Sequence, residues 1–388
     1  MTSPRPFRID IPDTTLDAMR AKVRAYEWHE MPRGPGLENS WAYGANLDFM
    51  HALCDYWVET YDWRKWEAEL NRFPQFKAQV EDIDVHFYRE DGSGPHPRPL
   101  ILSHGWPGSV FEFLHVIEPL AHPERFGGDA KDAFTVVVPS LPGYGFSGKP
   151  ARPISPRTIA RLFDRLMTET LGLSGYVAQG GDWGSAVSGW LGYEAKGCIA
   201  VHLNMMGWLS PGVVPETDAE RRHAESARLL FDAEGAYFRE QSTKPQTLSY
   251  AMMDSPVGAC AWIVEKFHGW SDIRKGFETV YSKDQLLTNV MIYLVTRSFN
   301  TATWLYRGLF EDFSGAPVPP QTRIEKPVAI ARFPVDLIPF PPRSQVERNM
   351  NVVRWTEFAE GGHFAALERP KELMDDIRAF ARSLPASA

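Results

Sequence analysis

The sequence Val-Ala-Gln-Gly-Gly-Asp-Trp-Gly-Ser, at residues 177–185, decides the fold. Gly180 and Gly184 stand two residues before and two residues after Asp182. Glycine at both positions lets a strand turn sharply into a closely packed helix, and the side chain at the tip is then exposed above the sheet. The alternative is an ordinary turn in which Asp182 caps the next helix, and the motif alone does not separate the two.

The residue at the tip is a carboxylate, where enzymes that transfer acyl groups from such an elbow carry serine. A carboxylate is a poor nucleophile for acyl transfer, but it attacks saturated carbon that carries a strained ring or a good leaving group. Asp182 therefore predicts an electrophilic sp3 carbon as the target, in an epoxide or an alkyl halide.

Composition excludes several classes of function. The 388 residues are 44% hydrophobic and 23% charged, as in ordinary soluble proteins, and the net charge of −8 disfavours a nucleic-acid partner. Cys54, Cys198 and Cys260 are far apart, so we expect no disulfide framework, no metal site, and a reducing, cytoplasmic location. No stretch approaches 18 apolar residues, so we expect no membrane anchor. We also expect no cofactor.

Apolar runs predict the order of the core strands. Residues 99–103 and 134–139 are near-continuous apolar runs, as in parallel strands buried on both faces. Residues 175–179 form the next expected strand and deliver Asp182. Helical patterns alternate with these strands, which predicts a doubly wound α/β fold with a mostly parallel central sheet.

The remaining patterns divide the chain into four expected segments. The first is an aromatic-rich meander with an extended segment at 7–12, a helix from Asp13, a helical region at 46–71, and a strand at 80–89. Residues 210–320 lose the strand–helix rhythm and become helical, and a strand resumes at 327–331. The segments are the N-terminal meander 1–95, the first part of the core 96–209, a helical cap 210–322, and the second part of the core 323–388.

Two further motifs fit the elbow as parts of one catalytic site in the α/β-hydrolase arrangement. His104-Gly-Trp-Pro-Gly-Ser follows the first core strand, where such enzymes donate a backbone N–H to an oxyanion hole. The expected donors are Trp106 and Trp183, while His104 itself is expected to be structural. His363 lies on a glycine-flanked loop near the C-terminus, last in the chain order of nucleophile, acid and histidine, and would act as general base for water.

The acid that orients His363 is expected on the loop after the strand that ends near Arg332. Asp336 lies there, and it would fix the tautomer of His363 and stabilise its imidazolium form. Three glutamates, Glu325, Glu357 and Glu360, are the alternatives.

Together these residues resemble the microsomal-type epoxide hydrolases over nearly the whole chain. The resemblance rests on the meander, on the motifs around Trp106, Asp182 and His363, and on two cap stretches at 254–258 and 286–291. It implies an α/β-hydrolase core, a homodimer, and two cap tyrosines that hydrogen-bond the epoxide oxygen. By the surrounding pattern these are Tyr237 and Tyr306, with three competitors, Tyr250, Tyr281 and Tyr293. Some relatives carry Glu where Asp336 stands.

The expected function is hydrolysis of an epoxide to a vicinal diol through an ester on Asp182. The many aromatic residues, 13 Trp and 23 Phe among them, favour a bulky or aryl epoxide. A haloalkane dehalogenase with the same Asp nucleophile is the first alternative, and a non-catalytic binding protein of the hydrolase fold is the second. Detoxification and secondary-metabolite biosynthesis remain open as physiological roles.

Overall fold

The computed structural model describes residues 3–37, 40–208, 210–312, 315 and 317–385. The segment boundary expected at Leu209, and both ends of the chain, lie outside these residues. The strands are β1 (Arg5–Phe7), β2 (Gln75–Val80), β3 (Ile83–Glu90), β4 (Arg98–Ser103), β5 (Phe134–Pro139), β6 (Tyr176–Gly180), β7 (Cys198–Leu203), β8 (Ile324–Arg332) and β9 (Met350–Glu357).

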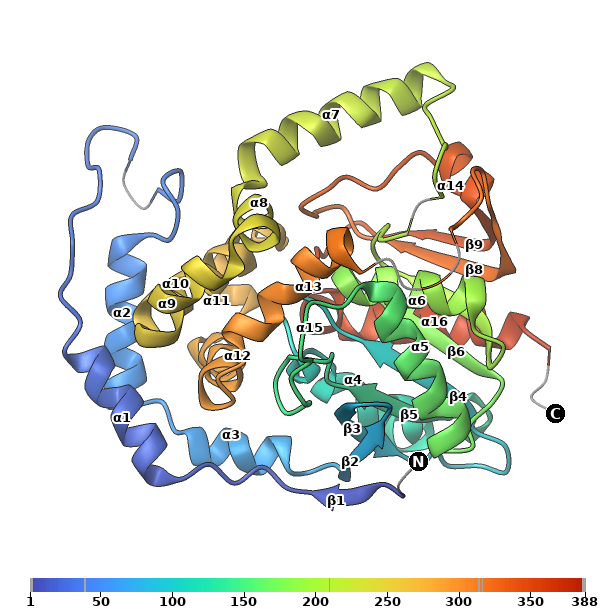
Figure 1. Cartoon of the computed structure of the whole chain (residues 1–388), viewed down its shortest axis with the longest axis horizontal. Helices are drawn as coiled ribbons and strands as arrows, with labels where there is room; N and C mark the ends of the chain where they lie inside the picture. The colour runs from blue at the N-terminus through green and yellow to red at the C-terminus, as the bar shows by residue number, and fades with distance from the viewer. Residues whose placement is uncertain (1–2, 38–39, 209, 313–314, 316, 386–388) are drawn as a thin grey trace.

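These strands form, within the described residues, one nine-stranded sheet in the order β1-β2-β3-β5-β4-β6-β7-β8-β9 (Figure 1). The pairs from β5 to β9 are parallel, whereas β1, β2 and β3 pair antiparallel with one another and β3 pairs antiparallel with β5. Every residue of β5 and β6 is buried. Burial on both faces explains their uninterrupted apolar runs, and the expected mostly parallel α/β fold is confirmed.

The strands expected at 99–103, 134–139, 175–179 and 327–331 correspond to β4, β5, β6 and β8. The single strand expected at 80–89 is wrong at its start, because Val80 ends β2 and pairs with Ile83 of β3 in a hairpin. The turn between them places Glu81 at φ 53°, in the left-handed region. Glycine or asparagine is the usual residue there, and the sequence has neither at this position, so the turn could not be predicted. Strands β7 and β9 were not expected at all.

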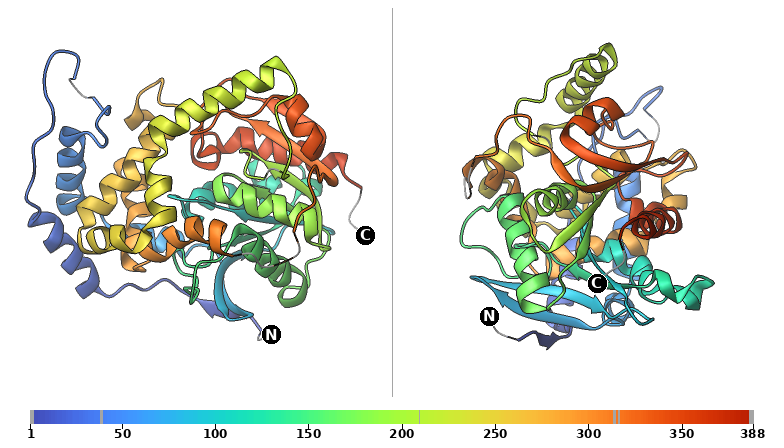
Figure 2. Two further views of the ribbon diagram at one scale, coloured as in Figure 1. Left: turned by 45° about the horizontal axis from the view of Figure 1, so that its top comes forward. Right: turned by 90° about the vertical axis from the view of Figure 1, so that its right-hand side faces the viewer.

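Helices cover both faces of the sheet (Figure 2). Helix α5 packs against α6 on one face, and α4, α15 and α16 pack together on the other. These core helices are α4 (Leu114–Ala121), α5 (Pro156–Arg165), α6 (Asp182–Glu194), α14 (Arg343–Asn349), α15 (Ala365–Glu368) and α16 (Pro370–Ser383).

Seven helices lie between β7 and β8 in the described part of the chain, and we call them the cap. They are α7 (Asp218–Glu234), α8 (Ala236–Thr243), α9 (Pro245–Asp254), α10 (Pro256–Trp270), α11 (Phe277–Val280), α12 (Lys283–Val295) and α13 (Phe299–Glu311). Ser282 and Gln285 form a capping box at the start of α12, and Ser255 caps α10. Helix α13 packs against α8 and α9.

The N-terminal segment lies against the cap, as its blue helices do in Figure 1. Its helices are α1 (Asp13–Arg24), α2 (Leu47–Glu59) and α3 (Trp63–Leu70), so the helical region expected at 46–71 is two helices. Asp62 breaks it by accepting a hydrogen bond from the backbone N–H of Arg64 as an N-cap. The Tyr61 hydroxyl lies 3.0 Å from Thr288 Oγ1 on α12, and the Tyr56 hydroxyl donates to Asp284 at 2.8 Å.

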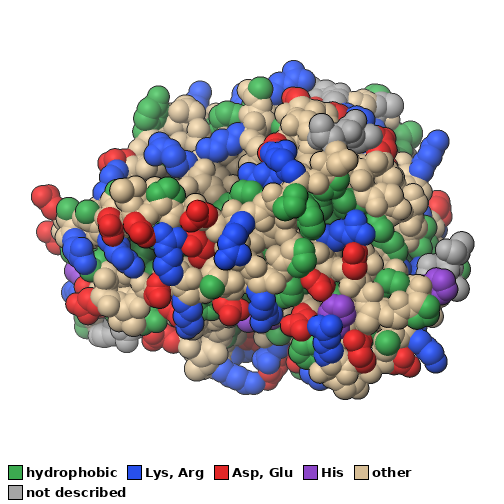
Figure 3. Space-filling view, turned by 90° about the horizontal axis from the view of Figure 1, so that it is seen from below, with side chains coloured by type: hydrophobic (Ala, Val, Ile, Leu, Met, Phe, Trp, Pro, Cys, Tyr) green, Lys and Arg blue, Asp and Glu red, His purple; other side chains and the backbone are tan. Residues whose placement is uncertain are grey.

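The surface carries charges of both signs. On the face in Figure 3, Lys and Arg side chains are interspersed with Asp and Glu. None of the helices in the described ranges is long and apolar enough to cross a membrane. Within those ranges, no cluster of three or more His, Cys, Asp or Glu side chains is arranged to hold a metal ion.

Candidate active site

The elbow places Asp182 at the junction of β6 and α6. Strand β6 ends at Gly180, and Asp182 begins the helix with φ at 47°. A left-handed conformation in a residue other than glycine is uncommon and strained, and such strain clusters at functional sites. The turn therefore exposes the Asp182 carboxylate above the carboxyl edge of the sheet.

Two glycines are needed for close approach around this carboxylate. A Cβ atom at Gly184 would lie 1.8 Å from the carbonyl oxygen of Ser103, so a side chain would force α6 away from β4. A Cβ atom at Gly105 would lie 2.1 Å from Asp182 Oδ1. Glycine at 105 thus lets the loop after β4 reach the Asp182 carboxylate.

That loop supplies a hydrogen bond to Asp182. The backbone N–H of Trp106 donates to Asp182 Oδ1 at 2.8 Å. Helix α12 of the cap holds the loop in place: Asn289 Nδ2 donates to the Pro107 carbonyl at 2.7 Å, and the Tyr293 hydroxyl donates to the Gly108 carbonyl at 2.6 Å. The Trp106 N–H thus faces the carboxylate, and the role of Trp106 and Trp183 as oxyanion donors remains a prediction.

His363 lies between two carboxylates. Its Nε2 is 3.3 Å from Asp182 Oδ2, and its Nδ1 is 2.7 Å from Asp336 Oδ1. Burial opposes the charged imidazolium, but the two carboxylates outweigh it and raise the pKa of His363 well above its usual value. The imidazole can therefore exchange a proton at Nε2 while Asp336 holds Nδ1.

Asp336, rather than any of the competing glutamates, contacts His363. Glu325 and Glu357 are largely exposed and pair with Arg323 and Arg332. Glu360 pairs with Lys275 and Arg369. The backbone N–H of Leu337 donates to Asp336 Oδ1 at 2.6 Å, which orients the carboxylate.

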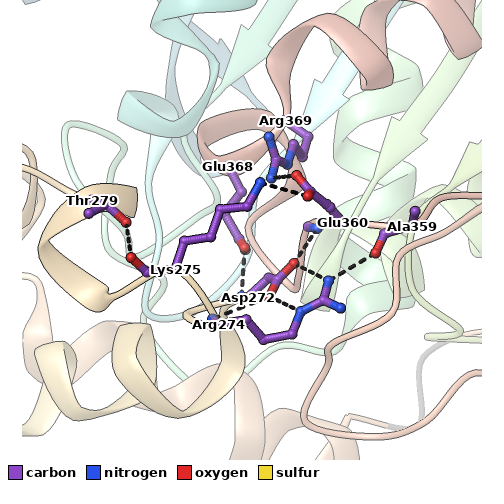
Figure 4. Close-up of polar contacts among 9 residues, drawn as sticks. Asp272, Arg274, Lys275, Thr279, Ala359, Glu360, Glu368 and Arg369 are labelled. Carbon is purple, nitrogen blue, oxygen red and sulfur yellow. Dashed lines mark hydrogen bonds and ion pairs between the residues drawn. The ribbon is translucent and has the colours of Figure 1, made fainter.

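The loop that carries His363 is fastened to the cap segment after α10, as Figure 4 shows. The N–H of Gly361 donates to Asp272 Oδ2 at 2.9 Å, and the N–H of Asp272 donates to Glu368 Oε2 at 2.8 Å. The N–H of His363 itself donates to the Trp270 carbonyl at 3.0 Å. These bonds fix the position of His363 relative to the cap.

Tyr237 and Tyr306 lie together near Asp182, among aromatic rings of the cap and core. The Tyr237 ring stacks on Trp106 at 5.3 Å between centroids, and the Tyr306 ring meets Trp183 edge-on at 4.8 Å. Burial, and the charge of Asp182 close by, raise the pKa of both hydroxyls well above 10. Both phenols therefore carry their protons and can donate hydrogen bonds.

The three competing tyrosines are placed elsewhere. Tyr250 is 75% exposed. Tyr281 lies 2.8 Å from Ser271 Oγ, and Tyr293 is engaged with the oxyanion loop. His104 is buried and neutral, as expected of a structural residue, because burial lowers its pKa to about 4 and its Nε2 accepts the Leu141 N–H at 3.1 Å.

Three polar residues near Asp182 were missed from the sequence. Glu112 and Gln179 line a small cavity beside Asp182. The buried Tyr144 hydroxyl lacks a hydrogen-bond partner among the described residues, and the charge of Asp182 contributes to raising its pKa. Ser109-x-x-Glu112 is a helix-capping pattern, so the sequence offered a structural explanation for Glu112 and no signal for the other two.

The mostly parallel sheet, the strand-to-helix elbow and the cap between β7 and β8 define an α/β-hydrolase. Comparison with known proteins agrees and adds detail. Residues 4–113 match the family described as "Epoxide hydrolase N terminus", and residues 98–211 match the family described as "alpha/beta hydrolase fold".

Full-length relatives identify the family. The chain is 37% identical to a Stigmatella aurantiaca protein named as a candidate epoxide hydrolase, over 98% of this chain and 85% of that one. It is 31% identical to epoxide hydrolase 1 of Sus scrofa, over 97% and 88% of the two chains. The solved structure of Aspergillus niger epoxide hydrolase superposes with a TM-score of 0.86 at 34% identity, over 99% and 97% of the two chains. The chain belongs to the epoxide hydrolase family and is an epoxide hydrolase.

Proposed function

We propose that this enzyme opens an epoxide by forming an ester on Asp182 and hydrolyses that ester with water activated by His363. The observation that supports this mechanism is the position of the Asp182 carboxylate between a backbone N–H donor and the imidazole of His363. Oδ1 accepts the Trp106 N–H, and Oδ2 lies 3.3 Å from His363 Nε2. The carboxylate is therefore oriented for attack and adjacent to a base for the second step.

Ring opening uses Asp182 and the cap tyrosines. Asp182 Oδ2 attacks a ring carbon, the carbon–oxygen bond breaks, and the departing oxygen takes a proton from Tyr237 or Tyr306. An alkoxide is a poor leaving group, so donation by a phenol lowers the barrier. The ring contacts that place both tyrosines against Trp106 and Trp183 support this role.

Ester hydrolysis uses His363. Esterification removes the negative charge of Asp182, which is one of the two charges that raise the pKa of His363. The pKa of His363 then falls, and Nε2 can accept a proton from water as the water oxygen attacks Asp182 Cγ. The oxyanion forms at Oδ1, where the N–H groups of Trp106 and Trp183 stabilise it. Asp336 stabilises the imidazolium.

A single turnover in oxygen-18 water tests the ester. With enzyme in excess, the diol should be largely unlabelled, because its new oxygen comes from Asp182. His363→Gln should stop at the ester, and intact-mass measurement should show protein heavier by one epoxide at Asp182. The exposed His96 gives a control, His96→Gln, which should turn over normally. Full labelling of the diol would exclude the covalent mechanism.

The substrate we propose is an epoxide with a bulky or aryl substituent. Aromatic rings surround the nucleophile, and ring–ring contacts favour flat apolar groups. They are Trp106, Trp183, Tyr237, Phe238, Trp270 and Tyr306. A panel of aryl and short alkyl epoxides, with chiral analysis of the diols, measures this preference. Bromide release from alkyl bromides would instead support the dehalogenase alternative.

We also propose an oligomeric state and a cellular location for the enzyme. A homodimer is implied by resemblance, and a cytoplasmic location by the three buried free cysteines. Size-exclusion chromatography with light scattering and cell fractionation test them. A detoxifying role predicts turnover of many epoxides, whereas a biosynthetic role predicts one strongly preferred epoxide.

A further inference from the structure

A small enclosed cavity lies beside Asp182. Its lining includes Asp182 and His363, together with Glu112, Gln179 and Asn204, whereas neither cap tyrosine is among its lining residues. Its volume is about 10 Å³, about the space that one water molecule requires. A molecule in this cavity would therefore contact Asp182 from a different side than the cap tyrosines do.

Two buried polar atoms at this cavity lack a hydrogen-bond partner among the described residues. They are Gln179 Oε1 and His363 Nε2, and the latter has only its 3.3 Å ion-pair contact with Asp182 Oδ2. Gln179 Nε2 donates to Asn204 Oδ1 at 2.8 Å, which fixes the amide and leaves its oxygen unpaired. Buried polar atoms are rarely unpaired, and a water needs two to four polar partners. Gln179 Oε1 thus supplies one acceptor for a hydrogen of one water, and His363 Nε2 supplies a second once esterification of Asp182 has lowered the pKa of His363 and Nε2 has lost its proton.

Glu112 contributes a carboxyl group to the same cavity. A Cβ atom at Gly108 would lie 1.5 Å from Glu112 Oε1, so glycine at 108 provides the space that this carboxyl occupies. The side chain keeps some accessible surface although protein encloses its carboxyl group, and it lines the cavity. Ser109 donates its backbone N–H to this carboxyl, as in a helix cap. A cap needs one acceptor oxygen, and a carboxyl group has two.

We propose that this cavity binds the water that hydrolyses the ester, and that Glu112 and Gln179 are the residues that position it. The inference rests on the proposed covalent mechanism. The water oxygen bonds to Asp182 Cγ and one water proton passes to His363 Nε2. The tetrahedral intermediate then collapses, the ester carbon–oxygen bond breaks, and the diol oxygen takes the proton from His363. Asp182 is left as a carboxylic acid, whose proton restores the tyrosine used in ring opening.

The protonation of Glu112 agrees with this role. Burial and the charge of Asp182 raise the pKa of Glu112 to about 8, although His363 opposes the shift. Glu112 is therefore mostly neutral while Asp182 is ionised, and two anions do not face each other. A neutral Glu112 keeps a carbonyl oxygen, which can share with Gln179 Oε1 the water hydrogen that does not pass to His363.

Glu112→Gln tests the proposal because it preserves size and the acceptor for the Ser109 cap. Rapid mixing followed by tryptophan fluorescence separates alkylation from hydrolysis. We expect hydrolysis to slow by about tenfold to a hundredfold, the effect of losing one strong hydrogen bond, with alkylation within about twofold of wild type. The ester should accumulate in steady state, and kcat and KM should fall together. Glu118→Gln, on the following helix α4 and paired with Arg125, is the matched control and should change neither step.

Unchanged hydrolysis, or equal slowing of both steps, would overturn the proposal and leave Glu112 as a helix cap. If Glu112→Gln does not fold, Gln179→Met removes the second acceptor and is judged by the same criteria. Trapping of the ester in the His363→Gln variant separates a failure of the water site from a failure of the covalent mechanism. An ester on Asp182 in that variant, with wild-type hydrolysis in Glu112→Gln, would refute only the water site. Absence of an ester in that variant would refute the covalent mechanism.

Discussion

The neighbouring backbone imposes the orientation of the Asp182 side chain. Its left-handed φ of 47° and the N–H of Trp106 fix the carboxylate before substrate arrives. Cap residues complete the arrangement from the opposite side, because the hydroxyls of Tyr237 and Tyr306 are buried near the same carboxylate. Preorganised donors of this kind cost no rearrangement during the reaction.

At this residue scale, we expect Tyr237→Phe and Tyr306→Phe each to lose part of the alkylation rate. A hydrogen bond to a developing alkoxide contributes about 1.5–3 kcal/mol, which is about ten- to a few-hundred-fold in rate. The double variant should be nearly inactive toward epoxides. Single-turnover alkylation rates measure the losses, and Tyr250→Phe is the control because Tyr250 is exposed. Wild-type rates in both single variants would reduce these tyrosines to packing residues and reopen the dehalogenase alternative.

Two pairs of elements around the site approach so closely that a side chain would not fit between them. The loop after β4 approaches Asp182 at Gly105, and α6 approaches β4 at Gly184. Helix α12 holds the same loop from the cap through Asn289 and Tyr293. Catalytic geometry therefore depends on contacts between elements that are far apart in the sequence.

At the scale of elements, Gly105→Ala should slow alkylation on the order of 100-fold, because displacing a reacting group by about 1 Å has this effect. The added Cβ would lie 2.1 Å from Asp182 Oδ1 and must displace either the carboxylate or the loop. Gly269→Ala on α10 is the matched control, since its nearest neighbour would be 4.0 Å away. Stopped-flow alkylation rates and melting temperatures compare the two. Equal alkylation rates would mean that the loop has room to adjust.

Across the whole molecule, a buried ionic cluster joins the C-terminal helix α16 to the sheet. Asp376 accepts hydrogen bonds from Arg354 Nε at 2.7 Å and from the Thr356 hydroxyl at 2.6 Å, and it lies 3.0 Å from His202 Nε2. Burial opposes its ionisation, but hydrogen bonds led by that with His202 outweigh burial and lower the pKa of Asp376 to about 2. None of these four residues lines the cavity beside Asp182, and we expect the cluster to stabilise the fold.

Asp376→Asn should lower the free energy of unfolding by about 3 kcal/mol, because buried hydrogen bonds to a charged group are lost. Asp375 is the preceding residue on the same helix and is half exposed. Asp375→Asn should lower the free energy of unfolding by less than about 1 kcal/mol. Urea titrations at pH 7 measure both values. The folded-state pKa is depressed, so the stabilisation is complete above the unfolded pKa of about 4 and is lost as pH falls toward 2. A deficit that persists unchanged at pH 2 would contradict this assignment.

Local patterns in the sequence determined the framework. Glycine spacing sets the elbow because Cβ atoms at Gly180 and Gly184 would overlap backbone, and this steric requirement is visible in the sequence itself. Buried parallel strands read as apolar runs for a similarly local reason. At Glu81 no glycine or asparagine marks the left-handed turn, and the predicted start of the strand at residue 80 was wrong for that reason.

Tertiary structure alone decided which distant polar groups meet. Asp336 was one of four candidate acids, and its 2.7 Å contact with His363 depends on how the loops after β8 and β9 converge. Glu112 and Gln179 lie 67 residues apart in sequence, so no local pattern predicts the cavity that both of them line. Backbone sterics act between neighbours in the chain, and a water-sized cavity arises only when elements pack.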